Sequence, residues 1–139
     1  MSIIGHGIDI VDVRSIEALV KQKEEGFAKQ YLTVAERNVS GFNTNHWQYL
    51  ASRLAAKKAV LKVLCRDYQQ SDLWLEIEIQ KRSTGEPYVV LYATALQIAT
   101  KFGITKWLLS ISHTPFYAAA SAIAFSTTNK CQLHAHPPQ

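Results

Sequence analysis

The longest helical pattern in the chain runs from Asn45 to Leu64, and it constrains the fold more than any other stretch. Its apolar residues recur every three to four positions without an interrupting Gly or Pro, which predicts one long helix. Thr44 is placed to cap its first turn. Four alanines in the segment favour helix and let another backbone approach closely. We therefore expect the rest of the chain to pack around this helix.

The same segment carries four cations, Arg53, Lys57, Lys58 and Lys62. Lys58 and Lys62 are four positions apart and share one side of the predicted helix, and Arg53 and Lys57 form the adjoining row. Like charges at this spacing repel each other, so the cluster has two interpretations. One is a solvated basic face, which the pattern alone favours. The other is a site for a phosphorylated ligand, reached by lysine heads on buried stems.

The segments on either side predict an α+β domain with a mostly antiparallel sheet packed on the long central helix. The last strand is made of small apolar residues, which suits close packing against a helix or a neighbouring subunit. We expect one domain over residues 1–126 and a polar tail over 127–139. The expected strands are 3–13, 73–81, 88–92, 107–112 and 117–125, with a turn at Gly85 between the second and third; the expected helices are 13–23, short helices near Phe27 and after a Thr33–Glu36 capping box, 45–64 and 94–102.

Asp9 interrupts one face of the N-terminal strand. Gly5 and Gly7 thin that face just before the acid, as is typical where a ligand or another backbone approaches closely. A carboxylate on an apolar face is costly unless it meets a cation, a metal or hydrogen-bond donors. Asp9 is therefore a candidate ligand for a phosphate-bound Mg²⁺, and the alternative is an edge-strand residue that faces water. His113, just before a Pro turn, is a candidate phosphate donor or a structural turn residue.

Composition limits the partners. The net charge of +4 and the pI near 9.1 favour an acidic partner, and 47% hydrophobic residues are typical of a soluble globular protein. Basic residues cluster at one place without interleaved aromatic residues, so we expect no nucleic-acid binding. The apolar stretch 107–125 is broken by Ser, His and Pro, so we expect no membrane span. The N-terminal segment lacks the basic start of a signal peptide, and the two cysteines, Cys65 and Cys131, cannot form a disulfide framework. Both features predict a reduced, cytoplasmic setting.

Four separated motifs occur in an order that resembles one known family, the holo-acyl-carrier-protein synthases, which are small 4'-phosphopantetheinyl transferases. The match is colinear from about Ile3 to Phe125. Its motifs are Ile4-Gly-His-Gly-Ile-Asp-Ile10, Arg53-Leu-Ala-Ala-Lys-Lys-Ala59 with Lys62, Thr84-Gly-Glu-Pro87, and Ser110-Ile-Ser-His-Thr114 before Tyr117-Ala-Ala-Ala120.

The resemblance implies transfer of the phosphopantetheine arm of coenzyme A to a serine of apo acyl carrier protein, with release of 3',5'-ADP. Asp9 and Lys62 would be catalytic, with Asp9 as a Mg²⁺ ligand and Lys62 near the diphosphate and the incoming serine. Arg14 would contact the carrier protein. The coenzyme A contacts implied by the match are Arg53, Lys57, Lys58, Lys62, Gly85, Pro87 and His113.

The resemblance also implies a cytoplasmic homotrimer with its sites between subunits and a role in lipid metabolism, as in fatty acid biosynthesis. It leaves open which carrier protein is served.

One position departs from the family pattern. The motif usually reads Arg-x-Ala-Ala-Lys-Glu-Ala, and its Glu is the second metal ligand; here that position is Lys58. Three hypotheses follow: Lys58 neutralises the diphosphate in place of the metal, Lys58 turns away and leaves a weaker Mg²⁺ site on Asp9, or the chain binds coenzyme A or carrier protein without efficient transfer. We place transfer with altered metal use first and a catalytically impaired binding homologue second.

Overall fold

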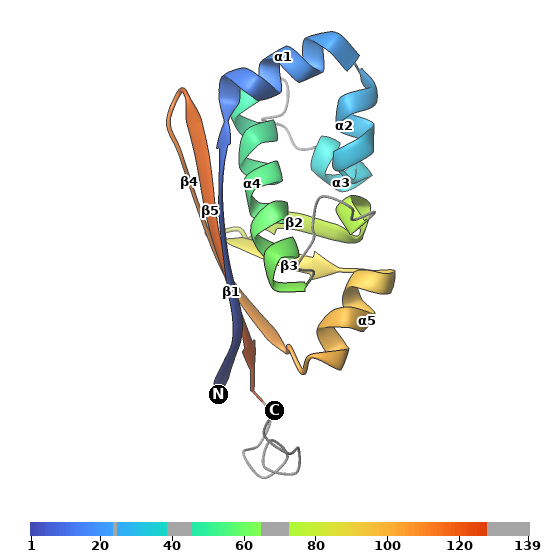
Figure 1. Cartoon of the computed structure of the whole chain (residues 1–139), viewed down its shortest axis with the longest axis vertical. Helices are drawn as coiled ribbons and strands as arrows, with labels where there is room; N and C mark the ends of the chain where they lie inside the picture. Colours follow the sequence, from blue (N-terminus) through green and yellow to red (C-terminus); the bar gives the residue numbers. More distant parts are fainter. Residues whose placement is uncertain (24, 39–45, 65–72, 128–139) are drawn as a thin grey trace.

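The computed structural model describes residues 1–23, 25–38, 46–64 and 73–127, and within them it confirms the predicted α+β fold with antiparallel sheets (Figure 1). The predicted cap at Thr44 and the tail beyond residue 127 lie outside these ranges. The elements are β1 (Ser2–Asp12), α1 (Val13–Lys23), α2 (Glu25–Tyr31), α3 (Val34–Arg37), α4 (His46–Leu64), the 3-10 helix η2 (Leu73–Glu76), β2 (Ile77–Lys81), β3 (Pro87–Leu91), α5 (Ala93–Lys101), β4 (Lys106–His113) and β5 (Tyr117–Ser126).

Helix α4 lies along one face of a three-stranded antiparallel sheet with the strand order β1-β5-β4 (Figure 1). The face of β5 toward the helix is a row of alanines, Ala118, Ala120, Ala122 and Ala124, all buried. Alanines of α4 meet this row, and small side chains on both surfaces let the helix lie close to the sheet. The small-residue strand thus packs against a helix, as one of its two interpretations predicted.

The glycines of β1 are required by the same close approach. A Cβ atom at Gly7 would lie 2.0 Å from the carbonyl oxygen of Ala59, and one at Gly5 would lie 2.9 Å from Cγ1 of Val63. The first clash is with backbone, which cannot rotate away. The predicted reason for these glycines, contact with another backbone, is confirmed at Gly7.

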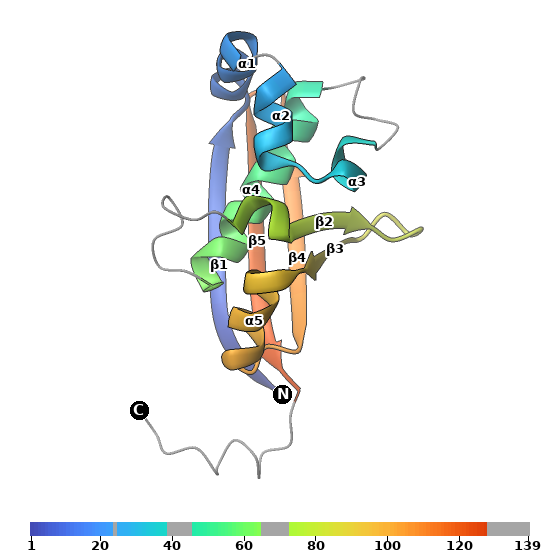
Figure 2. The same cartoon turned by 90° about the vertical axis from the view of Figure 1, so that its right-hand side faces the viewer.

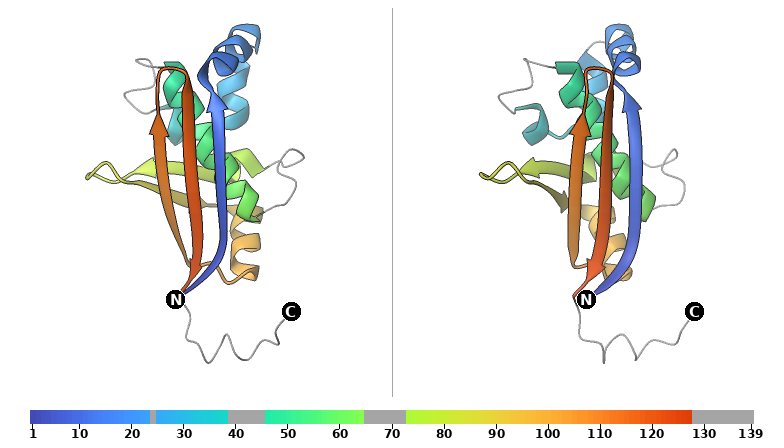
Figure 3. Two further views of the ribbon diagram at one scale, coloured as in Figure 1. Left: turned by 60° about the vertical axis from the view of Figure 1, so that its left-hand side comes forward. Right: turned by 90° about the vertical axis from the view of Figure 1, so that its left-hand side faces the viewer.

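None of the described helices or strands covers the opposite face of the three-stranded sheet. No helix lies in front of β1, β5 and β4 when they are viewed from that side (Figure 3). Three of its large side chains are apolar: Ile8, Ile10 and Leu108 are 62%, 66% and 43% exposed. His6 and Ser121 on the same face form a hydrogen bond with each other. An exposed apolar surface of this kind marks a site of association.

Strands β2 and β3 form a separate two-stranded sheet that runs crosswise to the other strands (Figure 2). Gly85 has a φ of 93°, which confirms the predicted turn. The prediction of one strand over 73–81 is wrong in its first half, because residues 73–76 form η2 and leave Leu75 48% exposed. The Glu76 carboxylate, at the end of η2, accepts a hydrogen bond from the amide of Ala95 and so connects η2 to the start of α5.

Candidate active site

Lys57 is a buried structural residue. Its side chain has no exposed surface, and its Nζ lies 2.6 Å from Oε1 of Glu36. The same ammonium donates to the carbonyl oxygens of Tyr31 and Trp74, at 2.6 and 2.8 Å. Burial lowers the pKa of Lys57, and the charge of Glu36 acts in the opposite direction. An ammonium so enclosed has no surface left for a ligand, so the expected contact between Lys57 and coenzyme A is corrected to a structural role.

Glu36 was identified from the sequence only as part of a capping box, and that box is present. Its carboxylate accepts hydrogen bonds from the amides of Thr33 and Ile79, both at 2.8 Å, in addition to its pair with Lys57. One buried carboxylate therefore joins α3, α4 and β2. The S/T-x-x-E spacing predicts the contact with the amide of Thr33, but no local sequence pattern predicts the contacts with Ile79 and Lys57.

Asp9 and Lys62 form the pair that the sequence motifs predicted to act together. Lys62 Nζ lies 3.1 Å from Asp9 Oδ1 and donates to the carbonyl oxygen of Ile8 at 2.7 Å. The Asp9 side chain is only 9% exposed, so the alternative of a water-facing edge residue is wrong. Its second oxygen, Oδ2, is buried and has no hydrogen-bond partner within the part of the chain that is described. A buried carboxylate oxygen without a donor is a place for a cation.

Lys58 lies one helical turn before Lys62 and on the same side of α4. It is half-buried and has no hydrogen bond or ion pair among the described residues. Strand β1 runs antiparallel to α4, since Gly5 lies beside Val63 and Gly7 lies beside Ala59. By the same step, two further residues along β1 bring Asp9 level with Ala55, which begins the turn of α4 that ends at Lys58.

This donor set does not fit a Mg²⁺ ion. Such an ion takes one or two carboxylates and repels ammonium groups held beside it. Asp9 offers one carboxylate, one of whose oxygens is already paired with Lys62, and the neighbouring turn presents Lys58. Among the described residues, no three or more His, Cys, Asp or Glu side chains lie close enough together to hold a metal ion. The expected metal role of Asp9 is thus not matched by a second ligand.

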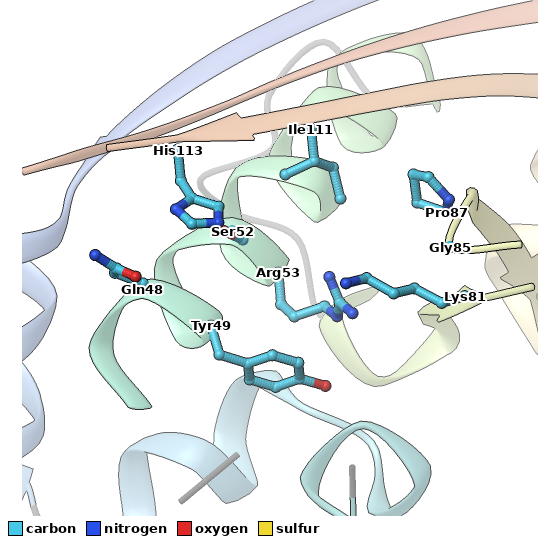
Figure 4. Close-up of a pocket in the computed structure, with 9 residues that line it drawn as sticks. All are labelled: Gln48, Tyr49, Ser52, Arg53, Lys81, Gly85, Pro87, Ile111 and His113. Atoms are coloured by element: carbon cyan, nitrogen blue, oxygen red, sulfur yellow. The ribbon is translucent and has the colours of Figure 1, made fainter. Parts of the chain in front are cut away.

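A pocket of about 330 Å³ lies between the first half of α4, the β2–β3 hairpin and β4 (Figure 4). It brings together four of the predicted coenzyme A contacts from three separate motifs. These are Arg53, Gly85, Pro87 and His113; the other lining residues are Gln48, Tyr49, Ser52, Lys81 and Ile111.

The pocket is cationic on one side. The guanidinium of Arg53 lies over the ring of Tyr49, 4.6 Å from its centroid, and Tyr49 donates to the carbonyl oxygen of Glu36 at 2.7 Å. Arg53 Nε is buried and has no hydrogen-bond partner among the residues described. Arg53 and Lys81 point toward one another across the pocket (Figure 4). Two cations that face each other attract an anion between them.

Lys81 is a site residue that sequence reasoning missed, because it is the last residue of β2 and belongs to none of the motifs. The interpretation of the helix cations as a solvated basic face is wrong, since Arg53 and Lys57 are buried. Each of the four cations has a different environment: Lys57 is paired in the core, Arg53 lines the pocket, Lys62 holds Asp9, and Lys58 is unpaired among the described residues.

The pocket and the Asp9–Lys62 pair lie on opposite flanks of α4. Asp9 is on β1 and Ile111 of the pocket is on β4, the two edge strands, and both pair with Ala120 of the central strand β5. Two strand spacings separate them by about 10 Å, and α4, itself about 10 Å across with its side chains, packs mainly on β1 and β5. In one copy of the chain, the pocket and the Asp9–Lys62 pair are therefore two separate clusters.

Arg14 lies at the exposed start of α1, as expected, but its charge is already balanced. Its Nε lies 3.1 Å from Oδ1 of Asp12, and its guanidinium lies over the rings of Phe116 and Tyr117 at 5.0 and 5.6 Å. The hydrogen bond from Arg14 holds the pKa of Asp12 below its usual value. A carrier protein that contacts Arg14 must compete with this carboxylate.

The α+β fold thus has a cationic pocket and a lysine–aspartate pair beside one helix, an arrangement of charge that suits an anionic ligand. The chain belongs to the 4'-phosphopantetheinyl transferase superfamily, whose family model matches residues 5–124. It is 34% identical to the holo-[acyl-carrier-protein] synthase of Hydrogenovibrio crunogenus over 124 residues, covering 89% of this chain and 98% of that protein.

Solved structures agree with this assignment. The holo-[acyl-carrier-protein] synthase of Neisseria meningitidis superposes with a TM-score of 0.78 at 30% identity, covering 89% of this chain and 99% of that one. The enzyme of Helicobacter pylori, solved in complex with coenzyme A, superposes with a TM-score of 0.72 at 27% identity, covering 87% and 100%. Among the helices described for this chain, none has both the length and the apolar character needed to cross a membrane.

Proposed function

We propose that the chain transfers the 4'-phosphopantetheine arm of coenzyme A to a serine of apo acyl carrier protein. The serine Oγ forms a bond to the phosphorus next to the pantetheine arm. The bond from that phosphorus to the bridging oxygen breaks, its electron pair leaves with 3',5'-ADP, and the serine proton passes to water. The observation that carries this proposal is the pocket, in which residues of three separate family motifs, Arg53, the Gly85–Pro87 hairpin and His113, meet around a cationic cavity.

Each half of the site has a distinct task. The pocket suits the nucleotide end of coenzyme A: Arg53 and Lys81 converge as they would on a phosphate, and the hairpin and His113 complete the walls. The other half suits the diphosphate. Lys62, oriented by Asp9, is partly exposed and can neutralise the charge that builds on the leaving oxygen.

The two halves support an assembly of identical chains in which each site is shared. If the β1 side of one copy meets the β4 side of the next, the contact joins two different surfaces, and such contacts form a ring when the rotation between copies closes. The uncovered apolar face formed by Ile8, Ile10 and Leu108 gives this assembly a surface to bury. These features support the homotrimer expected from the resemblance.

The remaining partners follow from charge. A net charge of +4 favours an acidic carrier protein, and Arg14 lines a hollow together with Trp47 and Gln48 of the first turns of α4. Helix α1, which carries Arg14, lies at the same end of the molecule as these turns (Figure 1). The cytoplasmic setting and the place in fatty acid biosynthesis stay predictions.

The activity is tested by incubating the purified chain with coenzyme A and an apo carrier protein and following the carrier's mass. We expect the serine-linked phosphopantetheine adduct and a stoichiometric amount of 3',5'-ADP. Coenzyme A binding in calorimetry without any adduct would favour the impaired binding homologue instead, an alternative that the comparisons do not favour.

The shared site is tested by co-expressing two inactive variants, Asp9→Asn and Arg53→Gln. In a shared site each lesion leaves the other half intact, so random assembly should restore about a quarter of the sites. A mixture with no more activity than either variant alone would place both halves in one chain.

A further inference from the structure

We propose that Lys58 is the counter-charge for the diphosphate of coenzyme A, so that the ligand is held by Lys58 and Lys62 without a divalent metal ion. The inference rests on the proposed function and identifies how that site recognises its substrate. It is carried by the disagreement between the family's metal site and the residues that this chain places there.

The first observation is the state of Asp9. One carboxylate oxygen is paired with Lys62 at 3.1 Å, and the other is buried and has no donor within the described part of the chain. A single carboxylate with one oxygen already paired is a poor anchor for Mg²⁺, but it suffices to attract one more ammonium.

The second observation is that such an ammonium is available. Lys58 is half-buried on the turn of α4 level with Asp9, and it has no ion pair or hydrogen bond among the described residues. The other buried cations of α4 are committed: Lys57 to Glu36 and Arg53 to the pocket. On the side of α4 that carries Lys62, Lys58 is thus the cation without an anion among the described residues.

The third observation is the local charge. Lys58 and Lys62 lie four residues apart on one side of the helix, and Asp9 cancels only one of their two charges. The remaining positive charge attracts an anion and repels Mg²⁺. A diphosphate spans two neighbouring ammonium groups, which makes it a better match to this pair than a single phosphate.

The experiment measures coenzyme A affinity by calorimetry with excess EDTA and with excess Mg²⁺, in the full chain and in Lys58→Met and Lys58→Glu. For the natural chain we expect the same dissociation constant under both conditions, within about twofold. Lys58→Met should weaken binding about 10- to 100-fold under both conditions, because a charge-assisted contact is lost. The matched control is Lys101→Met at the end of α5, which removes an exposed lysine outside the pocket and the Asp9–Lys62 pair and should bind like the natural chain.

Lys58→Glu should bind coenzyme A weakly in EDTA and regain affinity when Mg²⁺ is added, because the substitution creates a second carboxylate beside Asp9. A second readout uses Mn²⁺ followed by electron paramagnetic resonance in the presence of coenzyme A. We expect no bound Mn²⁺ for the natural chain and bound Mn²⁺ for Lys58→Glu.

Two results would overturn the inference and leave the proposed function standing: coenzyme A affinity in the natural chain that falls tenfold or more in EDTA, or Lys58→Met binding as tightly as the natural chain. If the natural chain binds no coenzyme A under either condition, both the inference and the proposed function are wrong. Circular dichroism of each variant establishes that it is folded.

Discussion

The ammonium of Lys57 and the carboxylate of Glu36 lie 2.6 Å apart with neither side chain exposed to solvent. The pair joins the short helix α3 to the central helix α4, and hydrogen bonds to the backbone of Tyr31, Trp74 and Ile79 extend it to three more segments. A buried charge that loses its partner is still desolvated, so removal of either side chain should be strongly destabilising. The pair therefore holds the two helices together.

Glu36→Gln and Lys57→Met should each lower the free energy of unfolding by about 3 to 5 kcal/mol, because each leaves the opposite charge buried alone. The double variant should be less destabilised than the sum of the two single changes. Urea unfolding followed by circular dichroism measures all three. Strict additivity would show that the two side chains are not coupled.

Gly7→Ala tests the close approach of β1 and α4. The new Cβ would lie 2.0 Å from the carbonyl oxygen of Ala59, so the two elements must separate, and we expect a loss of about 3 kcal/mol or more. Gly26→Ala on α2 is the matched control, since its Cβ would meet nothing within 4 Å. The control should be neutral or stabilising by up to about 1 kcal/mol. Similar melting temperatures for the two variants would contradict the contact.

Lys81→Met tests the cationic side of the pocket. We expect kcat/KM for coenzyme A to fall about tenfold through a higher KM, because one of the two converging cations is removed. Arg82→Met removes the neighbouring charge, which is stacked over Tyr88 outside the pocket, and should have little effect. Equal losses in the two variants would indicate a general effect of charge instead of a specific contact.

Asp12→Asn tests the competition for Arg14. The amide keeps the oxygen that accepts from the Arg14 backbone but removes the charge that pairs with the guanidinium. We expect KM for an acidic carrier protein to fall about two- to fivefold at low salt. The gain should vanish at high salt, because exposed charges are screened there. An unchanged KM at low salt would show that Arg14 does not contact the carrier.

Glu78 should make stability depend on pH in the acid range. Burial alone would raise the pKa of its carboxyl, but hydrogen bonds from Thr33, Gln80 and Tyr92 together lower it below the usual 4.5. Between the two pKa values the unfolded chain binds more protons than the folded one, so stability rises with pH. The contribution is complete above about pH 4.5 and is lost as the pH falls through the lowered pKa.

The check on this sign is the urea midpoint of the natural chain and of Glu78→Gln, measured from about pH 6 to about pH 3. The natural chain should lose more stability over this range than the variant, whose amide does not titrate. Parallel curves would contradict the assignment.

Local patterns predicted most of the fold because they depend on neighbours along the chain. The capping box at Thr33 and the turn at Gly85 are short-range features, and both are present. Local patterns do not predict the direction in which each cation of α4 points. Glu36, for example, lies far from Lys57 in sequence and contacts it only because α3 packs against α4. Once the sheet covers one side of α4 and other elements cover its remaining sides, helical spacing no longer distinguishes a solvated face from a buried one.

The part of the candidate site that belongs to the sequence motifs could be predicted. Asp9 with Lys62, and Arg53 with His113, do lie together in pairs. The sequence motifs do not predict that α4 separates these two pairs. They also contain no signal for Lys81, which reaches the pocket because the β2–β3 hairpin runs crosswise to the three-stranded sheet (Figure 2).

The placement of the two half-sites on opposite edge strands has a consequence for how such an enzyme responds to its own abundance. If each site is shared between two chains, as proposed above, a chain can be completely folded and still hold no working centre until it meets another chain. Turnover per molecule would then fall steeply on dilution while spectroscopic signatures of the fold stay constant, and a cell could silence the enzyme by lowering its amount below a threshold.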